Sequence, residues 1–229
     1  MSTARVWTVN AFLIACGCAP TPQDPAVDVG TDVVVERHPG YCTALSEYVG
    51  QPGPSGVRRA RYEGETLVAD EFDSDDDGDV DAIGRYDYED DLLIRWENDE
   101  FADGTTDEVR TYEWDDEGRM THERWDLGAD DTIDMDIRYE HDSEGRRTQG
   151  FGHSDDDQAT DLQLWFGYDD AGNLTILEMD GLRGKPDGEA DRVINHDYDE
   201  VGNQLTSFFD FDANGLADLR VTYTYDCWR

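Results

Sequence analysis

The chain repeats itself about every 27 residues, and this repetition restricts its fold more than any other feature. Each unit has a second aromatic position that marks the period. The marks are Tyr62, Tyr88, Trp114, His141, Tyr168, Tyr198 and Tyr225, which lie 26, 26, 27, 27, 30 and 27 residues apart. Such self-similarity means that each unit is one supersecondary element, which buries its apolar face only by stacking on its neighbours. We therefore expect residues 57–229 to form one repeat domain.

Each unit has the same internal order. An alternating strand such as 111–114 comes first, and a turn opened by Asp115 and closed by Gly118 follows. Asp bonds its own backbone in such turns, and Gly supplies the positive φ. A second strand such as 174–179 and an acidic loop complete the unit. This pattern predicts an all-β fold, an antiparallel meander of about six β-hairpin repeats.

One face of the predicted sheet is aromatic and must be covered. No segment has the helical periodicity needed to cover it, so the sheet must curl or close on itself. A barrel, a sandwich and a curled shell all satisfy this requirement, and the pattern does not choose between them.

Two of the units carry the clearest version of the turn. The runs 168–174 (YDDAGNL) and 198–205 (YDEVGNQL) resemble the tyrosine–aspartate repeat, also called the YD or RHS repeat. The resemblance covers roughly residues 57–229, and it implies curled β-sheets or hollow shells used for containment, adhesion or carbohydrate contact. This chain departs from that family in its longer period, because each unit carries an extra acidic loop. We expect no toxin-like domain after the repeats, so the delivery function of the large members is not carried over.

The first residues are typical of a bacterial lipoprotein. Arg5 precedes a short apolar run that ends in Leu-Ile-Ala-Cys, which resembles a lipobox with Cys16 as the acylated residue. The run is too short to span a bilayer but suits a signal peptide. We expect a signal peptide over 1–15 and a lipidated, Pro-rich acidic tether over 16–56. The predicted location is the bacterial cell envelope, anchored to the outer membrane and facing the periplasm or the cell surface.

Export to an oxidising compartment makes a disulfide possible. Cys42 precedes the repeats and Cys227 nearly ends them. A bridge between them would require the two ends of the sheet to meet, since disulfide Cα atoms lie within ~7 Å of each other. The alternative is two free or buried thiols.

The acidic loops are the candidate sites for chemistry. In the first loop (73–81), Asp73, Asp75, Asp77 and Asp81 occupy positions 1, 3, 5 and 9, and Gly78 occupies position 6. This spacing matches the first nine positions of an EF-hand-type loop, in which alternate oxygens converge on Ca²⁺. Position 12 lacks the usual Glu, so the loop is closer to the short Asp-rich loops of calcium-stabilised extracellular repeats.

The other loops keep the pattern to different degrees. The sixth loop (210–218) matches as well as the first, with its candidate ligands at Asp210, Asp212, Asn214 and Asp218. The second loop (99–107) keeps Asp99, Asp103 and Asp107 at positions 1, 5 and 9, and the third to fifth loops are similarly reduced. Two carboxylates ~4 Å apart repel by ~4 kcal/mol at an effective dielectric of ~20, so a converging set favours a cation. The alternative is that the side chains splay into water.

Charge restricts the possible partners. The chain has 18 Lys and Arg against 56 Asp and Glu, a net charge of −38, which excludes a basic surface for nucleic acid or anionic lipid. Membrane contact is therefore expected through the lipid anchor alone. We expect a monomer whose partner is an unidentified protein or polysaccharide.

Nothing in the sequence indicates an enzyme. No Cys/His spacing suggests zinc and no Gly-x-Ser-x-Gly run appears, while His141 and His196 occupy aromatic packing positions. We predict a calcium-stabilised surface module that binds or scaffolds. The first alternative is a carbohydrate-binding module that stacks sugars on exposed aromatics such as Trp96, Trp125 and Trp165. The second is a glycan-acting enzyme.

Overall fold

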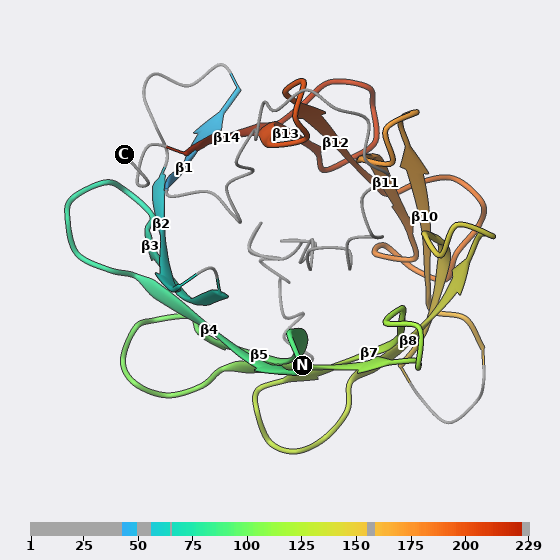
Figure 1. Ribbon diagram of the computed structural model, residues 1–229, viewed down its shortest axis with the longest axis horizontal. Coiled ribbons are helices and arrows are strands. Elements are labelled where there is room, and N and C mark those ends of the chain that lie inside the picture. Colours follow the sequence, from blue (N-terminus) through green and yellow to red (C-terminus); the bar gives the residue numbers. More distant parts are fainter. Residues whose placement is uncertain (1–42, 50–55, 65, 155–158, 226–229) are drawn as a thin grey trace, which may run out of the picture. The chain divides into compact units, whose positions relative to one another are not determined.

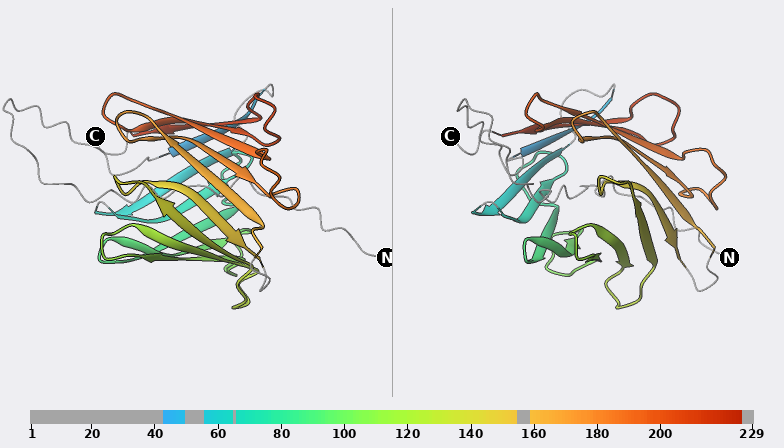
Figure 2. Two further views of the ribbon diagram at one scale, coloured as in Figure 1. Left: turned by 90° about the vertical axis from the view of Figure 1, so that its right-hand side faces the viewer. Right: turned by 45° about the vertical axis from the view of Figure 1, so that its right-hand side comes forward.

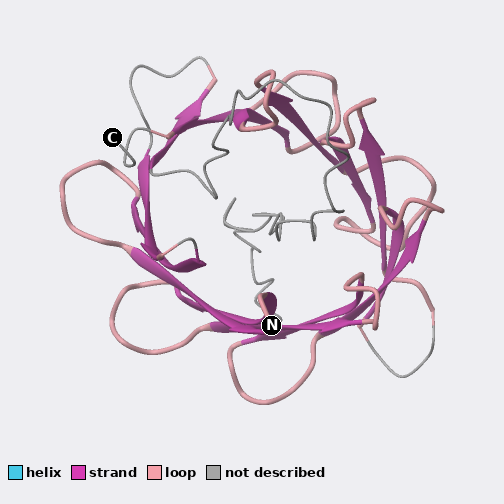
Figure 3. Ribbon diagram, in the orientation of Figure 1, coloured by secondary structure: helices cyan, strands magenta, loops and turns pink. Residues whose placement is uncertain are grey.

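The structure is a computed structural model that describes residues 43–49, 56–64, 66–154 and 159–225. Every regular element in these ranges is a strand (Figure 3). No helix long and apolar enough to cross a membrane occurs in them. The predicted signal peptide, Cys16, most of the tether, Cys42 and Cys227 lie outside the described residues.

Fourteen strands follow one another around a closed antiparallel barrel, as Figure 1 shows. Their bounds are β1 Thr43–Tyr48, β2 Gly56–Glu63, β3 Thr66–Asp73, β4 Ala82–Glu89, β5 Leu92–Asp99, β6 Glu108–Trp114, β7 Met120–Leu127, β8 Met135–His141, β9 Arg147–His153, β10 Leu162–Tyr168, β11 Leu174–Asp180, β12 Arg192–Tyr198, β13 Gln204–Asp210 and β14 Leu219–Thr224. Each strand pairs with the next in the chain. The predicted all-β meander is therefore confirmed, and its closure is that of a barrel.

Strand β1 closes the ring. It pairs with β2 on one side and with β14 on the other, with Thr43 opposite Thr224 and Tyr48 opposite Leu219. The barrel therefore begins inside the stretch assigned above to the tether. In each of the six complete hairpins, the first strand pairs with the second strand that follows it in the chain. Strand β14 is the first strand of a seventh unit, and β1 pairs with it in the position of a second strand. This pairing leaves no open edge between β14 and β2.

Four of the short hairpin turns, from β6–β7 to β12–β13, have the predicted Asp-to-Gly chemistry, and the β4–β5 turn has Asp90 and Asp91 at positive φ instead. In the β6–β7 turn, the Gly118 amide donates to the Asp115 carbonyl at 3.0 Å. The Asp115 carboxylate accepts from the amides of Glu117 and Arg119. Gly118 has a φ of 75°, a conformation that other residues rarely adopt. The turns opened by Asp142, Asp169 and Asp199 repeat these bonds.

The second aromatic position of a unit links successive hairpins. In each hairpin the register shifts just before this residue, as it does between Glu113 and Trp114. The shifted side chain can reach the backbone of the preceding hairpin. Three such bonds, each of 2.7 or 2.8 Å, run from Trp114 to the carbonyl of Leu93, from Tyr198 to that of Leu174 and from Tyr225 to that of Gln204. The repeated aromatic thus joins neighbouring units by a hydrogen bond as well as by packing.

Alternate residues of each strand form the core on the inner face of the barrel. Ile137, Leu177 and Ile194 are at most 1% exposed there. Small residues make room for large neighbours. A Cβ on Gly150 would lie only 3.0 Å from the Tyr139 ring and 3.1 Å from Leu164, so that position must stay small.

The inner face also contains a buried ion-pair network. The Arg110 guanidinium lies 2.8 Å from Glu108 and 3.1 Å from Glu123, between the rings of Trp96 and Trp125. The pKa of Arg110 is raised, since the attraction of these carboxylates outweighs the opposing effect of burial. Two of the tryptophans considered above for sugar stacking therefore contact this cation. Trp165 lies on the outer face of β10, opposite Glu178 of β11.

His196 has an interior packing position, as its place in the repeat suggested. Its Nδ1 lies 2.9 Å from the Ser207 hydroxyl and 2.8 Å from the Gln204 amide, while its Nε2 is buried without a partner. Burial lowers the pKa of His196 to about 4, so the ring is neutral at pH 7.

Candidate cation-binding loops

All six acidic loops lie at the same end of the barrel. They join β3–β4, β5–β6, β7–β8, β9–β10, β11–β12 and β13–β14, whereas the short turns join the intervening pairs. Successive strands of a meander run in opposite directions, so every second connection returns to the same end. Figure 2 shows the long connections gathered in this way. The predicted common margin of acidic loops is confirmed.

The first residue of the loop holds its bend. In the sixth loop, one oxygen of Asp210 accepts the Asn214 amide at 3.1 Å and the other accepts the Gly215 amide at 2.7 Å. The second loop has the same bonds to Asp99, at 3.0 and 2.9 Å. The position-1 carboxylates are nearly or fully buried in five loops, at Asp73, Asp99, Asp126, Asp180 and Asp210. The fourth loop has His153 at this position.

The last residue of the loop ties its two arms together. The Asp218 carboxylate accepts the Phe211 amide at 2.8 Å, and the Asp218 amide donates to the Phe209 carbonyl at 2.7 Å. Asp107 accepts the Glu100 amide at 2.8 Å in the equivalent bond of the second loop. The second and third loops therefore keep the bend of the first and sixth although neither has a carboxylate at position 3.

These hydrogen bonds also favour the ionised carboxylates. Burial alone would raise the pKa of Asp210, but the amides of Gly215 and Asn214 reverse the effect and the pKa is lowered. The pKa of Asp81 is lowered by bonds from the hydroxyl and amide of Ser74. Both groups are thus anionic throughout the neutral range, as a cation ligand must be.

Three carboxylates converge in the first loop and three in the sixth. Asp73, Asp75 and Asp81 each offer an oxygen within 4.8 Å of the others, and so do Asp210, Asp212 and Asp218. These are positions 1, 3 and 9 of the two loops that the sequence ranked highest. The position-5 oxygens are engaged locally instead. Asp77 accepts the Asp79 amide at 2.9 Å, and Asn214 accepts the Leu216 amide at 2.8 Å.

The second and third loops have no carboxylate at position 3. Phe101 occupies position 3 of the second loop and is 68% exposed, while Gly128 occupies it in the third. Asp99, Asp103 and Asp107, the predicted ligands of the second loop, do not converge as a three-carboxylate group in the described structure. Their assignment as ligands stays a prediction.

The fourth and fifth loops carry basic partners that sequence analysis did not anticipate. Lys185 Nζ lies 3.7 Å from Asp161, the last residue of the fourth loop, and Arg183 Nε lies 3.9 Å from Asp191 of the fifth. Arg183 also donates to the Phe211 carbonyl of the sixth loop at 3.0 Å. Both residues belong to the insertion in the fifth unit, which could have signalled this cross-linking. Asp155 and Asp157 of the fourth loop lie outside the described residues.

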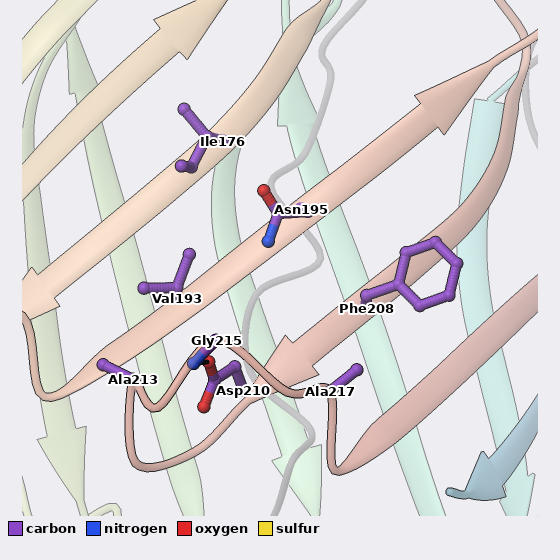
Figure 4. A pocket seen from close by; sticks show the side chains of 8 residues that line it. All are labelled: Ile176, Val193, Asn195, Phe208, Asp210, Ala213, Gly215 and Ala217. Atoms are coloured by element: carbon purple, nitrogen blue, oxygen red, sulfur yellow. Dashed lines mark hydrogen bonds between the residues drawn. The ribbon is translucent and has the colours of Figure 1, made fainter.

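A pocket of about 450 Å³ lies against the sixth loop (Figure 4). Ile176, Val193, Asn195 and Phe208 line it from β11, β12 and β13. The loop completes the lining with Asp210, Ala213, Gly215 and Ala217. Asp210 thus belongs both to the carboxylate group and to the pocket.

Comparison with known proteins adds little. No family model matches the chain, and no curated protein matches it. Similar solved structures include a crystal structure of TcdB2-TccC3-TEV, with 14% identity, a TM-score of 0.30 and 73% of this chain covered. The Tc holotoxin pore of Photorhabdus luminescens has 14% identity and a TM-score of 0.30, with 77% covered. This chain spans 10% and 12% of those chains. Likeness at this TM-score carries no conclusion about function.

Proposed function

We propose that the protein is a calcium-stabilised β-repeat barrel, anchored by lipid in the bacterial cell envelope, that acts as a binding or scaffolding module. The observation that carries this proposal is the pair of three-carboxylate groups, at Asp73, Asp75 and Asp81 and at Asp210, Asp212 and Asp218. Oxygen ligands of this kind suit hard cations, and Ca²⁺ tolerates the irregular geometry of a short loop better than Mg²⁺ does.

The position of these two loops gives calcium a structural role. The sixth loop joins β13 to β14 and the first joins β3 to β4, so they flank the seam at which β1 pairs with β14. The sixth loop also contacts the closing strand directly, since the Val49 amide donates to the Asp218 carbonyl at 2.8 Å. On the other side, Arg59 of β2 lies 3.7 Å from Asp73. Calcium in these loops would therefore stiffen both sides of the closure.

Electrostatics supports the same role. The chain carries a net charge of −38, and each converging group adds local repulsion among three carboxylates. One divalent ion in each loop would remove most of that repulsion. Extracellular calcium modules of this kind bind at ~10⁻⁴ to 10⁻³ M, so occupancy would follow the calcium level outside the cell.

A thermal melt tests the proposal. We expect millimolar calcium to raise the melting temperature of the purified protein by several degrees relative to chelator, while equal magnesium raises it less. The Asp75→Asn and Asp212→Asn double variant should lose the calcium shift and keep its melting temperature in chelator. Equal shifts in calcium and magnesium, or an undiminished shift in the double variant, would show that calcium acts on the general surface charge.

The anchor and the disulfide can be tested on the same protein. Mass spectrometry of the envelope form should find a lipid adduct on Cys16 and a Cys42–Cys227 peptide under non-reducing digestion. The pairing of Thr43 with Thr224 brings the two ends of the sheet together, which supports the proposed bridge. Alkylation of both thiols without prior reduction would exclude it.

A further inference from the structure

The outer face of the barrel differs between its two halves. On β2–β8 the outward side chains largely neutralise one another. Ion pairs there join Arg59 to Asp73, Arg85 to Asp99, Arg95 to Glu97 and Arg124 to Glu113. This half presents a mixed, self-compensated surface.

On β10–β13 the outward positions are apolar, neutral polar or acidic, and none of them is basic. Trp165, Ile176, Val193 and Phe208 are half-buried there. Glu178 lies opposite Val193, and the exposed Asp197 lies opposite Thr206. Neither of these carboxylates forms an ion pair with any described residue. Arg220 of the neighbouring β14 faces outward and is paired with Glu47, and Arg183 of the fifth loop donates to the Phe211 carbonyl of the sixth loop.

The pocket beside the sixth loop lies within this half (Figure 4). The loop lines it with the small side chain of Ala217 at position 8, where the first three loops have Val80, Thr106 and Ile133. The exposed Asn195 amide reaches into the pocket and makes no hydrogen bond with any described residue. The result is an apolar recess with a free amide, surrounded by uncompensated carboxylates.

We propose that this recess is a docking site for a cationic segment of a protein partner, whose apolar side chain enters the pocket. Charge complementarity selects this occupant. Glu178 and Asp197 attract Lys and Arg beside an apolar anchor, and the net charge of −38 steers a basic partner toward the barrel. An anionic ligand is repelled. The inference does not depend on calcium in the loops.

Fluorescence anisotropy with a labelled lysine-rich peptide that has one central phenylalanine tests the proposal. In chelator, Phe208→Ala and the pocket-filling Asn195→Trp should each weaken binding by about tenfold, and replacing the central phenylalanine by glycine should do the same. Asp197→Asn should weaken binding about threefold. Its matched control is Asp87→Asn, which removes one exposed carboxylate from β4, opposite Arg95, and should leave the affinity unchanged.

Three outcomes would overturn the proposal. Equal binding of the phenylalanine and glycine peptides would exclude the pocket as an anchor site. Equal losses in Asp87→Asn and Asp197→Asn would show attraction to the whole surface. Binding of a neutral oligosaccharide that depends on Phe208, without peptide binding, would assign the pocket to another ligand class. Each outcome leaves the calcium shift in melting temperature intact, so the two proposals fail separately.

Discussion

The second and sixth loops share one backbone conformation and differ in what their side chains can bind. In both, a buried Asp accepts two amides and a final Asp accepts a third. At position 3 the sixth loop has Asp212, which joins a three-carboxylate group, whereas the second has the exposed Phe101. The comparison teaches that the first and last carboxylates build the bend, and that a single further position decides whether the bend gathers enough oxygens for a cation.

The largest effect should come from removing a bend-forming carboxylate. Asp99→Ala removes the carboxylate that accepts the amides of Asp103 and Gly104, and the loss of two hydrogen bonds to a charged group should lower the free energy of unfolding by about 4 kcal/mol. Urea denaturation in chelator measures this loss. Asp99→Asn keeps an acceptor oxygen and should lose clearly less. If Asp99→Ala were neutral in chelator, the shared backbone would have another cause.

Acid titration should distinguish the buried His196 from the loop carboxylates, because they lose their contributions to stability in different pH ranges. His196 has a pKa of about 4 in the folded state against the usual 6.5, so only the unfolded chain gains its proton as the pH falls between these values. Stability should be full above pH 6.5 and fall by about 3 kcal/mol by pH 4. Urea denaturation across this range should show the loss in the wild type and a flatter profile in His196→Gln.

Asp81 and Asp210 in the loops titrate at a lower pH than His196. The pKa values of Asp81 and Asp210 are depressed below the usual 3.8, so their contribution is present above that pH and lost as the pH falls through the depressed values. The calcium shift in melting temperature should therefore persist from pH 6.5 to 5, where the stability linked to His196 is already falling. A calcium shift that disappeared together with the His196 titration would contradict the separation.

Removing the third carboxylate of the sixth loop should have a smaller effect, visible in calcium alone. Asp212→Asn should reduce the calcium stabilisation by about 1–2 kcal/mol, the linkage expected for a weak site at roughly 10 to 30 times its dissociation constant. Stability in chelator should not fall, because the amide bonds to Asp210 and Asp218 remain. Denaturation in calcium and in chelator gives both values. A loss in chelator would mean that Asp212 builds the bend.

The smallest effect should come from adding a carboxylate at position 3 of the second loop, and this substitution is also the sharpest test. Phe101→Asp places a third carboxylate beside Asp99 and Asp107 on a backbone that already has the required bend, with Ala102 at a φ of 49° against 52° for Ala213. The variant should gain about 1 kcal/mol of calcium stabilisation over the wild type. Phe101→Asn is the matched control without the added charge. Calcium titration that does not distinguish the two variants would contradict the role assigned to position 3.

Much of the site was readable from the sequence because its determinants are local. The turn at Asp115 and Gly118 and the bends at Asp73 and Asp210 depend on residues within nine positions of one another. Spacing alone therefore identified the first and sixth loops. At position 5, Asp77 and Asn214 each accept a nearby amide, which counting carboxylates does not reveal, and their assignment as ligands stays a prediction.

The sequence by itself determined the repeat, the hairpins and the common end of the acidic loops, since all of these follow from short-range periodicity and chain direction. The tertiary structure alone decided that β1 pairs with β14, that Lys185 and Arg183 partner neighbouring loops, and that the sixth loop borders a pocket. Thr43 and Thr224 are far apart in the chain, and their pairing depends on the curvature summed over every intervening strand. No local pattern encodes that sum.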